Sequence, residues 1–252
     1  MTKRYKLIGC EIMFREICLC AAQSKNIIDI EFLDKGLHDI GEKTMSASLQ
    51  QAINKVNTEK YDAILLCYGL CNYGVKGLRG PIPMVIPKAH DCITLFLGSK
   101  EKYTEYFNNN PGTFFRTSGW LERAHFGIEG EENVMSQLGI QPDADYSEFG
   151  EENAEYLREI LGNWIENYKK QIFIDTGIGD SAMYEDLTKA DAKARGLEYE
   201  NIKGDIRLIQ DLMDGSWSPE DFLVVPPGNE IVATYNDGIM SYLSAALDRE
   251  ND

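Results

Sequence analysis

The sequence lacks long apolar runs and is poor in basic residues. No apolar segment approaches the roughly 20 residues of a membrane helix, and the first residues lead directly into a short strand pattern, so we expect neither a membrane span nor a signal peptide. It has 25 lysines and arginines but 41 aspartates and glutamates, which gives a net charge of −16 at pH 7. Such a charge repels phosphate backbones, and the basic clusters Lys3-Arg4 and Lys169-Lys170 are too short to offset it. We therefore expect a cytoplasmic protein that binds neither nucleic acid nor membranes.

Nucleotide-binding motifs and paired cysteine motifs are also missing. The glycine-containing turns at 68–74 and 175–180 follow predicted strands, but neither matches GxGxxG or the Walker pattern. Tight turning explains them better than nucleotide binding, although their N–H groups can face an anion. All six cysteines lie in the first 92 residues of a 252-residue chain, and Cys67 and Cys71 are spaced more loosely than in a CxxC motif. This distribution favours reduced thiols over a secreted disulfide framework.

Strand and helix patterns alternate along both halves of the chain. Apolar runs predict strands at 5–10, 27–33, 61–66, 84–86, 113–117, 170–175 and 222–225. Helical spacing predicts helices at 12–22, 45–56, 93–107, 134–138, 153–168, 182–195, 206–213 and 239–247. Such alternation favours an α/β fold of two packed Rossmann-like lobes with mainly parallel sheets. We expect an N-terminal lobe at 1–110 that carries the functional site and a C-terminal lobe at 111–252 that closes a cleft.

Soft metal ligands follow three of the predicted strands. Cys10 ends the first strand, Cys71 lies in the turn after the strand at 61–66, and His90 and Cys92 follow the strand at 84–86. Loops at the carboxyl ends of parallel strands meet at one edge of a sheet, so these ligands are expected to be neighbours. Thiolates and imidazoles are preferred zinc ligands, and three thiolates with a fourth ligand also suit an iron–sulfur cluster. The sequence predicts a metal site of Cys10, Cys71, His90 and Cys92, with zinc and cluster both open.

The other cysteines have weaker claims to this site. Cys18 and Cys20 lie in an apolar helical run, where a free cysteine commonly fills space in the core. Cys67 ends a buried strand and stays an alternative fourth ligand to His90. We therefore assign Cys18 and Cys20 to the core.

Charged residues beside the predicted ligands are candidates for catalytic roles. Glu11 and Arg15 follow Cys10 at an expected helix start, where N–H groups and the macrodipole lower the pKa of a thiol. Asp91 lies between His90 and Cys92 and can orient the imidazole. Solvation at the surface is the alternative explanation for all three charged side chains.

Two further pairs of residues are candidates for cofactor binding. Tyr68 and Gly69 open the turn after the strand at 61–66. Arg116 lies near the end of the aromatic strand at 113–117, and Trp120 follows that strand. Arg116 would add a polar wall to the cleft and Trp120 an aromatic lid. A tight turn and a packed tryptophan are the structural alternatives.

Several short strings resemble those of the DUF1638 family. They are Cys10-Glu11 with Arg15-Glu16, Phe32-Leu33-Asp34-Lys35-Gly36-Leu37-His38, Tyr68-Gly69-Leu70-Cys71, Ala89-His90-Asp91-Cys92-Ile93-Thr94, Pro111-Gly112-Thr113 with Gly119-Trp120, and Val224-Val225-Pro226-Pro227-Gly228. The resemblance spans most of the chain. It implies a protein of anaerobic bacteria or archaea that is met beside corrinoid-dependent methyltransferase systems, and hence one-carbon metabolism. The family position of Cys67 is usually not cysteine, which makes this residue the weaker ligand.

Two functions of different classes follow from these residues and the resemblance. His90 and Cys92 with a distant third cysteine resemble the zinc site of cobalamin-linked thiol methyltransferases, where the metal lowers the pKa of a substrate thiol. The first expectation is thus a metal-dependent, methyltransferase-type enzyme that activates a thiol or one-carbon substrate through zinc or an iron–sulfur cluster. The second is a non-catalytic carrier of a metal, a cluster or a corrinoid. Expected partners are a small-molecule or thiol substrate and a corrinoid protein or methyltransferase, which would also supply any corrinoid.

Overall fold

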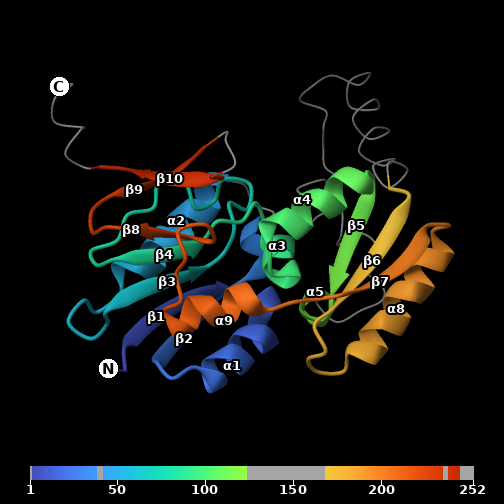
Figure 1. The fold of residues 1–252 in the computed structure, drawn as a ribbon, viewed down its shortest axis with the longest axis horizontal. Coiled ribbons are helices and arrows are strands. Elements are labelled where there is room, and N and C mark those ends of the chain that lie inside the picture. Colours follow the sequence, from blue (N-terminus) through green and yellow to red (C-terminus); the bar gives the residue numbers. More distant parts are fainter. Residues whose placement is uncertain (1, 39–41, 124–167, 235–237, 245–252) are drawn as a thin grey trace, which may run out of the picture.

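The computed structural model describes residues 2–38, 42–123, 168–234 and 238–244. These residues form two α/β lobes that lie side by side, with helices α3 (Cys92–Leu97) and α4 (Lys100–Asn109) between them (Figure 1). The helix predicted at 134–138 lies outside the described residues, as does the one at 153–168 apart from Tyr168. The expected α/β class with mainly parallel sheets is confirmed.

A five-stranded sheet with the order β2-β1-β3-β4-β8 forms the first lobe. Its strands are β1 (Arg4–Cys10), β2 (Ile27–Leu33), β3 (Ala63–Cys67), β4 (Met84–Pro87) and β8 (Phe222–Val225). The first four are parallel, and β8 pairs antiparallel with β4. Because β2 lies on one side of β1 and β3 on the other, the order reverses at β1, which opens a crevice at the carboxyl ends of β1 and β3.

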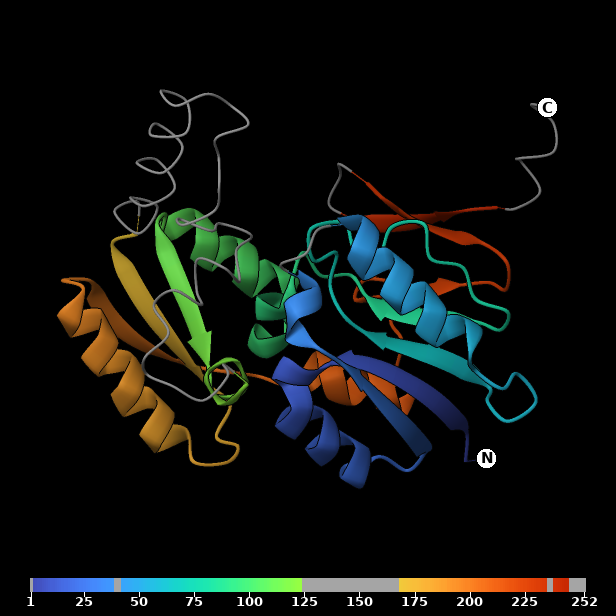
Figure 2. The same cartoon turned by 180° about the vertical axis from the view of Figure 1, so that it is seen from behind.

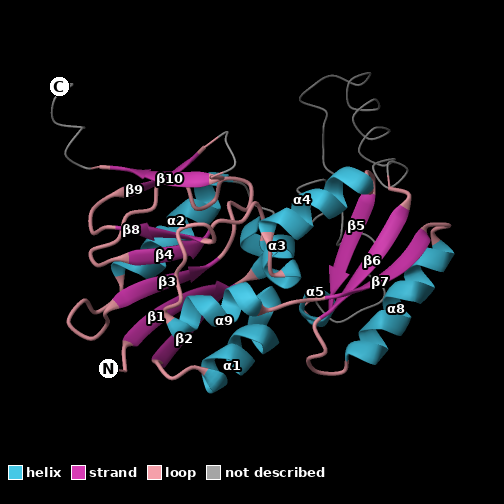
Figure 3. Ribbon diagram, viewed as in Figure 1, coloured by secondary structure: helices cyan, strands magenta, loops and turns pink. Residues whose placement is uncertain are grey.

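Alternating side chains divide the core of this lobe between the two faces of the sheet. Leu7 and Leu65 pack on one face with apolar residues of α1 (Phe14–Gln23) and α9 (Arg207–Asp214). Ile8 and Leu66 pack on the other with α2 (Glu42–Asn54) and the hairpin of β9 (Glu230–Ala233) and β10 (Met240–Leu243). Figure 3 shows both layers of helices around the strands. Since both faces are covered, the central strands are continuous apolar runs, and all of β3 is buried.

Three parallel strands in the order β5-β6-β7 form the sheet of the second lobe. They are β5 (Thr113–Thr117), β6 (Lys170–Asp175) and β7 (Glu198–Lys203), and α8 (Ser181–Ala194) packs against β6 and β7. Tyr106 of α4 packs against this sheet, with its ring centre 6.0 Å from that of Phe115. The Tyr106 hydroxyl donates a hydrogen bond to the Glu200 carboxylate at 2.7 Å. Figure 2 shows α4, in green, running alongside β5.

The chain returns to the first lobe after β7. Helix α9 packs against α1, β3 and β4, and β8 completes the first sheet next to β4. The expected division into 1–110 and 111–252 therefore needs a correction, because the segments from α9 to β10 belong with the first lobe. Their pairing joins residues far apart in sequence, which no local pattern reveals.

Several local elements differ from those predicted. The helix expected at 93–107 is two helices, because Gly98 ends α3 with a φ of 72° and the Ser99 side chain caps α4 by accepting from the Lys102 N–H. The helix expected at 239–247 is strand β10 over Met240–Leu243, which pairs with β9, while 245–247 lie outside the described residues. Strand β7 was not predicted because its sequence, EYENIK, is mostly polar.

Candidate functional site

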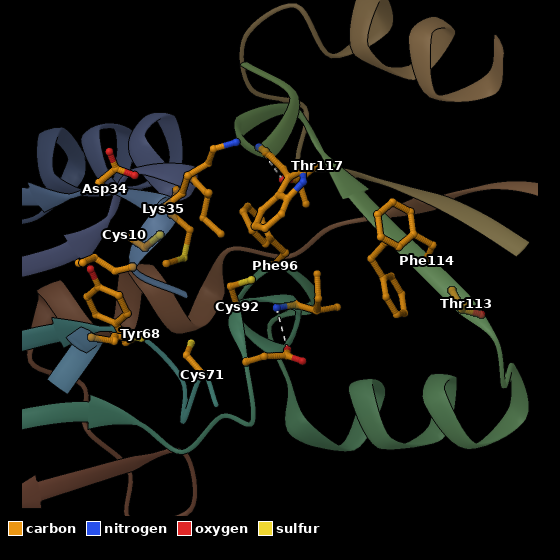
Figure 4. Close-up of a pocket in the computed structure, with 18 of the residues that line it drawn as sticks. Cys10, Asp34, Lys35, Tyr68, Cys71, Cys92, Phe96, Thr113, Phe114 and Thr117 are labelled. Carbon is orange, nitrogen blue, oxygen red and sulfur yellow. Dashed lines mark hydrogen bonds between the residues drawn. The ribbon is translucent and has the colours of Figure 1, made fainter. Parts of the chain in front are cut away.

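Three cysteines meet at the carboxyl edge of the first sheet. Cys10 is the last residue of β1, Cys71 lies in the turn after β3, and Cys92 is the first residue of α3. Strands β1 and β3 are neighbours, with Gly9 opposite Cys67, so the segments after them start side by side. Figure 4 shows the three sulfur atoms facing a common space. The structure therefore places the three cysteines at one edge of the sheet.

The three thiols line a cavity of about 260 Å³ that lies between the lobes. Phe114 and Thr117 of β5 lie on its other side (Figure 4). Trp120 of α5 (Ser118–Glu122) also lines the cavity. Most lining side chains are apolar, and the volume is near the lower end of the range of small-molecule sites, roughly 300–1,000 Å³. Ligands of α/β folds bind at the carboxyl ends of strands where the order reverses, so the position itself indicates a binding site.

The neighbouring loop fixes the turn that carries Cys71. The Cys71 N–H donates to the carbonyl oxygen of His90 at 3.0 Å. Gly69 makes this approach possible, because a Cβ atom there would lie 2.7 Å from the backbone nitrogen of Asp91. The loops after β3 and β4 are thus joined backbone to backbone, which sets Cys71 beside Cys92.

Strain is concentrated in the same turn. Cys71, Asn72 and Tyr73 have φ values of 43°, 54° and 65°, a run of three non-glycine residues in the left-handed region. This conformation costs roughly 1–2 kcal/mol for each such residue. Backbone strain of this kind persists where the surroundings enforce it, commonly at functional sites.

Burial raises the pKa of all three thiols. The pKa of Cys10 and that of Cys71 rise to about 12, and that of Cys92 lies well above its usual range, because the surrounding protein desolvates the thiolates. Backbone N–H groups act in the opposite direction, from Ile12 on Cys10 and from Cys92 on Cys71. Without an added cation the three side chains are therefore neutral thiols at neutral pH.

His90 does not join the three cysteines. Its side chain is exposed and does not line the cavity, and its ring lies 6.0 Å from that of Tyr103. The backbone carbonyl of His90, not the imidazole, faces the Cys71 turn. The expected set of four ligands is thus reduced to three in this structure.

Asp91 has a structural role that differs from the one predicted. Its Oδ1 accepts from the Ile93 N–H at 2.9 Å and caps α3, and its Oδ2 accepts from the Tyr103 hydroxyl at 2.9 Å. The side chain lines the cavity, and burial raises the pKa of its carboxyl. Because His90 points elsewhere, Asp91 does not orient the imidazole but fixes the helix start that carries Cys92.

Glu11 and Arg15, the other two predicted catalytic residues, bind neighbouring segments. The Arg15 guanidinium donates to both carboxylate oxygens of Glu122 in α5, at 2.7 and 3.0 Å. Glu11 accepts from the Lys35 N–H at 3.1 Å. Neither Glu11 nor Arg15 lines the cavity, so Arg15 joins the two lobes and Glu11 holds the segment after β2.

The four predicted cofactor-binding residues separate into two pairs. Tyr68 and Trp120 line the cavity. Gly69 instead packs against the backbone of Asp91 and does not line the cavity. The Arg116 guanidinium lies 3.5 Å from the Asp191 carboxylate of α8, and Arg116 is not among the lining residues. Arg116 does not contribute the expected polar wall, because its guanidinium is directed to the Asp191 carboxylate of α8.

The sequence reasoning missed Lys35 and much of the aromatic wall. Lys35 is buried, its ammonium lies 5.4 Å from the centre of the Trp120 ring, and its charge opposes the rise in the pKa of Cys10. Phe96 and Tyr168 add to the lining. Lys35 follows the carboxyl end of β2, so the rule that identified the cysteines also points to it, whereas nothing local distinguishes the aromatic residues from ordinary core.

A family comparison defines how the chain is related to other proteins. The family model described as "Protein of unknown function (DUF1638)" matches residues 32–213, which is more than half of the chain. The chain belongs to the DUF1638 family. The matched part of this DUF1638 protein contains Cys71, Cys92 and the β5 wall of the cavity, and it begins after Cys10. Comparisons with curated proteins and with solved structures gave no match.

Two further findings concern metal-binding groups and membrane-spanning helices in this DUF1638 protein. Within the described residues, no three or more His, Cys, Asp or Glu side chains are grouped so that they could hold a metal ion as they stand. The thiols at the cavity are of the type that soft metals prefer, but as placed they do not form such a group. In the same part of the chain, no helix is long and apolar enough to cross a membrane.

Proposed function

We propose that the cavity binds a small, largely apolar molecule and that Cys10, Cys71 and Cys92 hold a soft metal centre beside it, either zinc or an iron–sulfur cluster. The observation that carries this proposal is that three cysteines from three separate segments line one cavity at the point where the strand order reverses. Three thiolates leave a coordination position open for a ligand in either kind of centre. The loss of His90 from the expected set therefore favours a reactive centre over a closed structural one.

The surroundings of the sulfur atoms support this choice of donors. The backbone of Ile12 beside Cys10, and that of Gly69 and Cys92 beside Cys71, act to lower the pKa of these two thiols against the larger effect of burial. Hydrogen bonds to sulfur ligands tune iron–sulfur centres and stabilise thiolates. Ordinary core cysteines need no such donors.

A bound centre of this kind would supply a Lewis acid that lowers the pKa of a substrate thiol or polarises a one-carbon substrate. The chain itself contributes the apolar walls that exclude water, and Asp91 holds the start of α3 in place. The resemblance to proteins met beside corrinoid-dependent methyltransferase systems supports cytoplasmic, anaerobic one-carbon metabolism, with a methyltransferase or a corrinoid protein as partner.

A non-catalytic carrier of a metal, cluster or corrinoid is the second candidate, and one observation favours it. The three side chains predicted to be catalytic, Glu11, Arg15 and Asp91, are all engaged in structural contacts. A carrier needs a binding cavity and a soft centre but no general base. Methyl transfer from methylcobalamin to 2-mercaptoethanol separates the two candidates, since only an enzyme releases the methyl thioether and cob(I)alamin.

Metal analysis of anaerobically purified protein tests the proposal. We expect a stoichiometric centre, with iron, sulfide and broad visible absorption for a cluster, or zinc and no colour. Cys10→Ser, Cys71→Ser and Cys92→Ser should each lose the metal. Cys18→Ser is the matched control, because Cys18 is a half-buried cysteine of α1 that does not line the cavity, and it should keep the metal. Wild-type protein without metal, or metal retained in all three variants, would show that the cysteines are not ligands.

A further inference from the structure

We infer that the Tyr68 hydroxyl anchors the ligand of this cavity, and that the ligand is a small aromatic compound carrying a hydrogen-bond acceptor such as a carbonyl oxygen. This inference rests on one part of the proposed function, namely that the cavity binds a small molecule. It goes further by naming the class of ligand and the residue that orients it.

The first step concerns the hydroxyl of Tyr68. The residue is 3% exposed and lines the cavity, and its hydroxyl has no hydrogen-bond partner among the described residues. A buried hydroxyl without a partner costs free energy that phenylalanine would avoid at the same position. Such groups are rare in folded proteins and call for an explanation, of which a bound ligand is one.

The second step concerns where this hydroxyl lies. Tyr68 directly follows the buried strand β3, so its backbone is fixed by the sheet. Figure 4 shows its side chain next to Cys10 and Cys71. A ligand atom that accepts from Tyr68 would therefore lie on the cysteine side of the cavity. The same contact would orient the reactive end of the ligand toward the thiols.

The third step concerns the rest of the lining, which is rich in aromatic rings. Five of them come from α3, β5, α5 and the segment before β6, namely Phe96, Phe114, Phe115, Trp120 and Tyr168. Aromatic rings favour tilted or offset contacts with other rings, so this wall suits a planar, unsaturated ligand. An apolar cavity of about 150 Å³ is enough for benzene, so the space of about 260 Å³ can hold a substituted ring.

The fourth step concerns which partner donates the hydrogen bond. A tyrosine hydroxyl carries one proton that it can donate, and no described residue accepts it from Tyr68. The matching group on the ligand is therefore an acceptor, and a neutral carbonyl fits it without an added charge.

Two probes of nearly equal shape test the role of the hydroxyl. Acetophenone presents a carbonyl oxygen, and α-methylstyrene has a methylene group in its place. We would titrate both by calorimetry into anaerobically purified full-length protein and into Tyr68→Phe. Tyr68→Phe should bind acetophenone about three- to tenfold more weakly, the range for one hydrogen bond, with unchanged affinity for α-methylstyrene. Tyr61→Phe is the control, because the Tyr61 hydroxyl bonds Asp29 and Tyr61 does not line the cavity.

The outcomes separate this inference from the proposed function. Equal weakening of both probes in Tyr68→Phe would assign the residue to packing, and unchanged acetophenone binding would remove it as the anchor. If neither probe binds wild-type protein, the ligand class is wrong, and metal content measured on the same sample still decides the proposed function. If acetophenone binding depends on Tyr68 in protein that carries no metal, the inference stands and the metal centre fails. Tyr68→Phe should fold normally, because it removes no hydrogen bond to a described residue, and its thermal midpoint serves as the check.

Discussion

Replacing Gly119 with alanine tests how closely the two lobes are joined beside the cavity. Gly119 lies in α5, and a Cβ atom there would lie 1.7 Å from the carbonyl oxygen of Ile12. Ile12 belongs to the short helix η1 (Glu11–Met13) that directly follows Cys10. Because the obstacle is backbone, no side-chain rotation relieves the clash. The two backbones would have to separate by more than about 1 Å to reach ordinary contact.

The expected magnitude follows from two opposing effects. In an unobstructed helix, glycine to alanine stabilises by about 0.5–1 kcal/mol. Overpacking of a close contact destabilises by about 1–3 kcal/mol, and by more where backbone must move. We therefore expect a net loss of about 2 kcal/mol, which for a chain of this length lowers the melting temperature by roughly 4–8 °C. Ligand binding should weaken as well, because Trp120 adjoins Gly119 and lines the cavity.

Calorimetric melting with and without acetophenone measures both effects. Gly177→Ala is the matched control, since Gly177 has a φ of 69° but no atom near its missing Cβ. That change should lower the melting temperature through backbone strain alone and leave the ligand-induced shift intact. A Gly119→Ala protein that melts at or above the wild-type temperature, as helix propensity alone predicts, would refute a rigid joint between η1 and α5.

Three further substitutions have expected outcomes that depend on charge and capping. A hydrogen bond from Lys60 is the largest of several interactions that lower the pKa of Asp29 to about 2. Asp29 therefore stabilises the fold above pH 4, and this effect is lost as the pH falls from about 4 to 2. In urea titrations, the free energy of unfolding of Asp29→Asn should be lower than that of the wild type by about 1 kcal/mol at pH 7, and the difference should shrink over that range. Burial raises the pKa of Glu16, so its contribution to the stability of the fold is favourable below about pH 4 and is lost as the pH rises through its folded pKa. Glu16→Gln should therefore be more stable than the wild type at pH 8, by on the order of 1 kcal/mol. A gain in stability that persists at about pH 4 would contradict this account. Asp91→Ala removes the cap of α3 and should cost about 1–2 kcal/mol in thermal melts and reduce metal content through Cys92, whereas Asp91→Asn, which can still cap, should keep most of both.

The cysteine cluster could be predicted from sequence because two general rules suffice for it. Short apolar runs mark parallel strands, and the carboxyl ends of such strands share one edge, so Cys10, Cys71 and Cys92 are expected there whatever the loops do. The direction of a loop side chain follows from no such rule. His90 lies two residues from Cys92, yet its backbone carbonyl binds the Cys71 turn and its ring faces Tyr103.

The second wall of the cavity could not be predicted for a different reason. Phe114 and Trp120 have the same apolar character as core residues, and only the packing of one lobe on the other makes them cavity lining. The return of α9 and β8 to the first lobe is hidden in the same way, because β8 pairs with β4 across more than half of the chain. Local patterns specify the elements, whereas contacts between distant segments specify which surfaces face each other.

The origin of the two walls has a consequence for how the site can work. The thiols and Tyr68 are attached to the central strands β1 and β3 or to the loop bonded to them, which are the most buried parts of the first lobe. The aromatic side comes mainly from β5 and α5 of the second lobe, which meets the first at the contacts of Gly119 with Ile12 and of Arg15 with Glu122. The thiols and the Tyr68 hydroxyl are therefore held by the first lobe and most of the aromatic wall by the second, so substitutions in β5 and α5 can change the shape of the cavity without altering the strands that hold the cysteines.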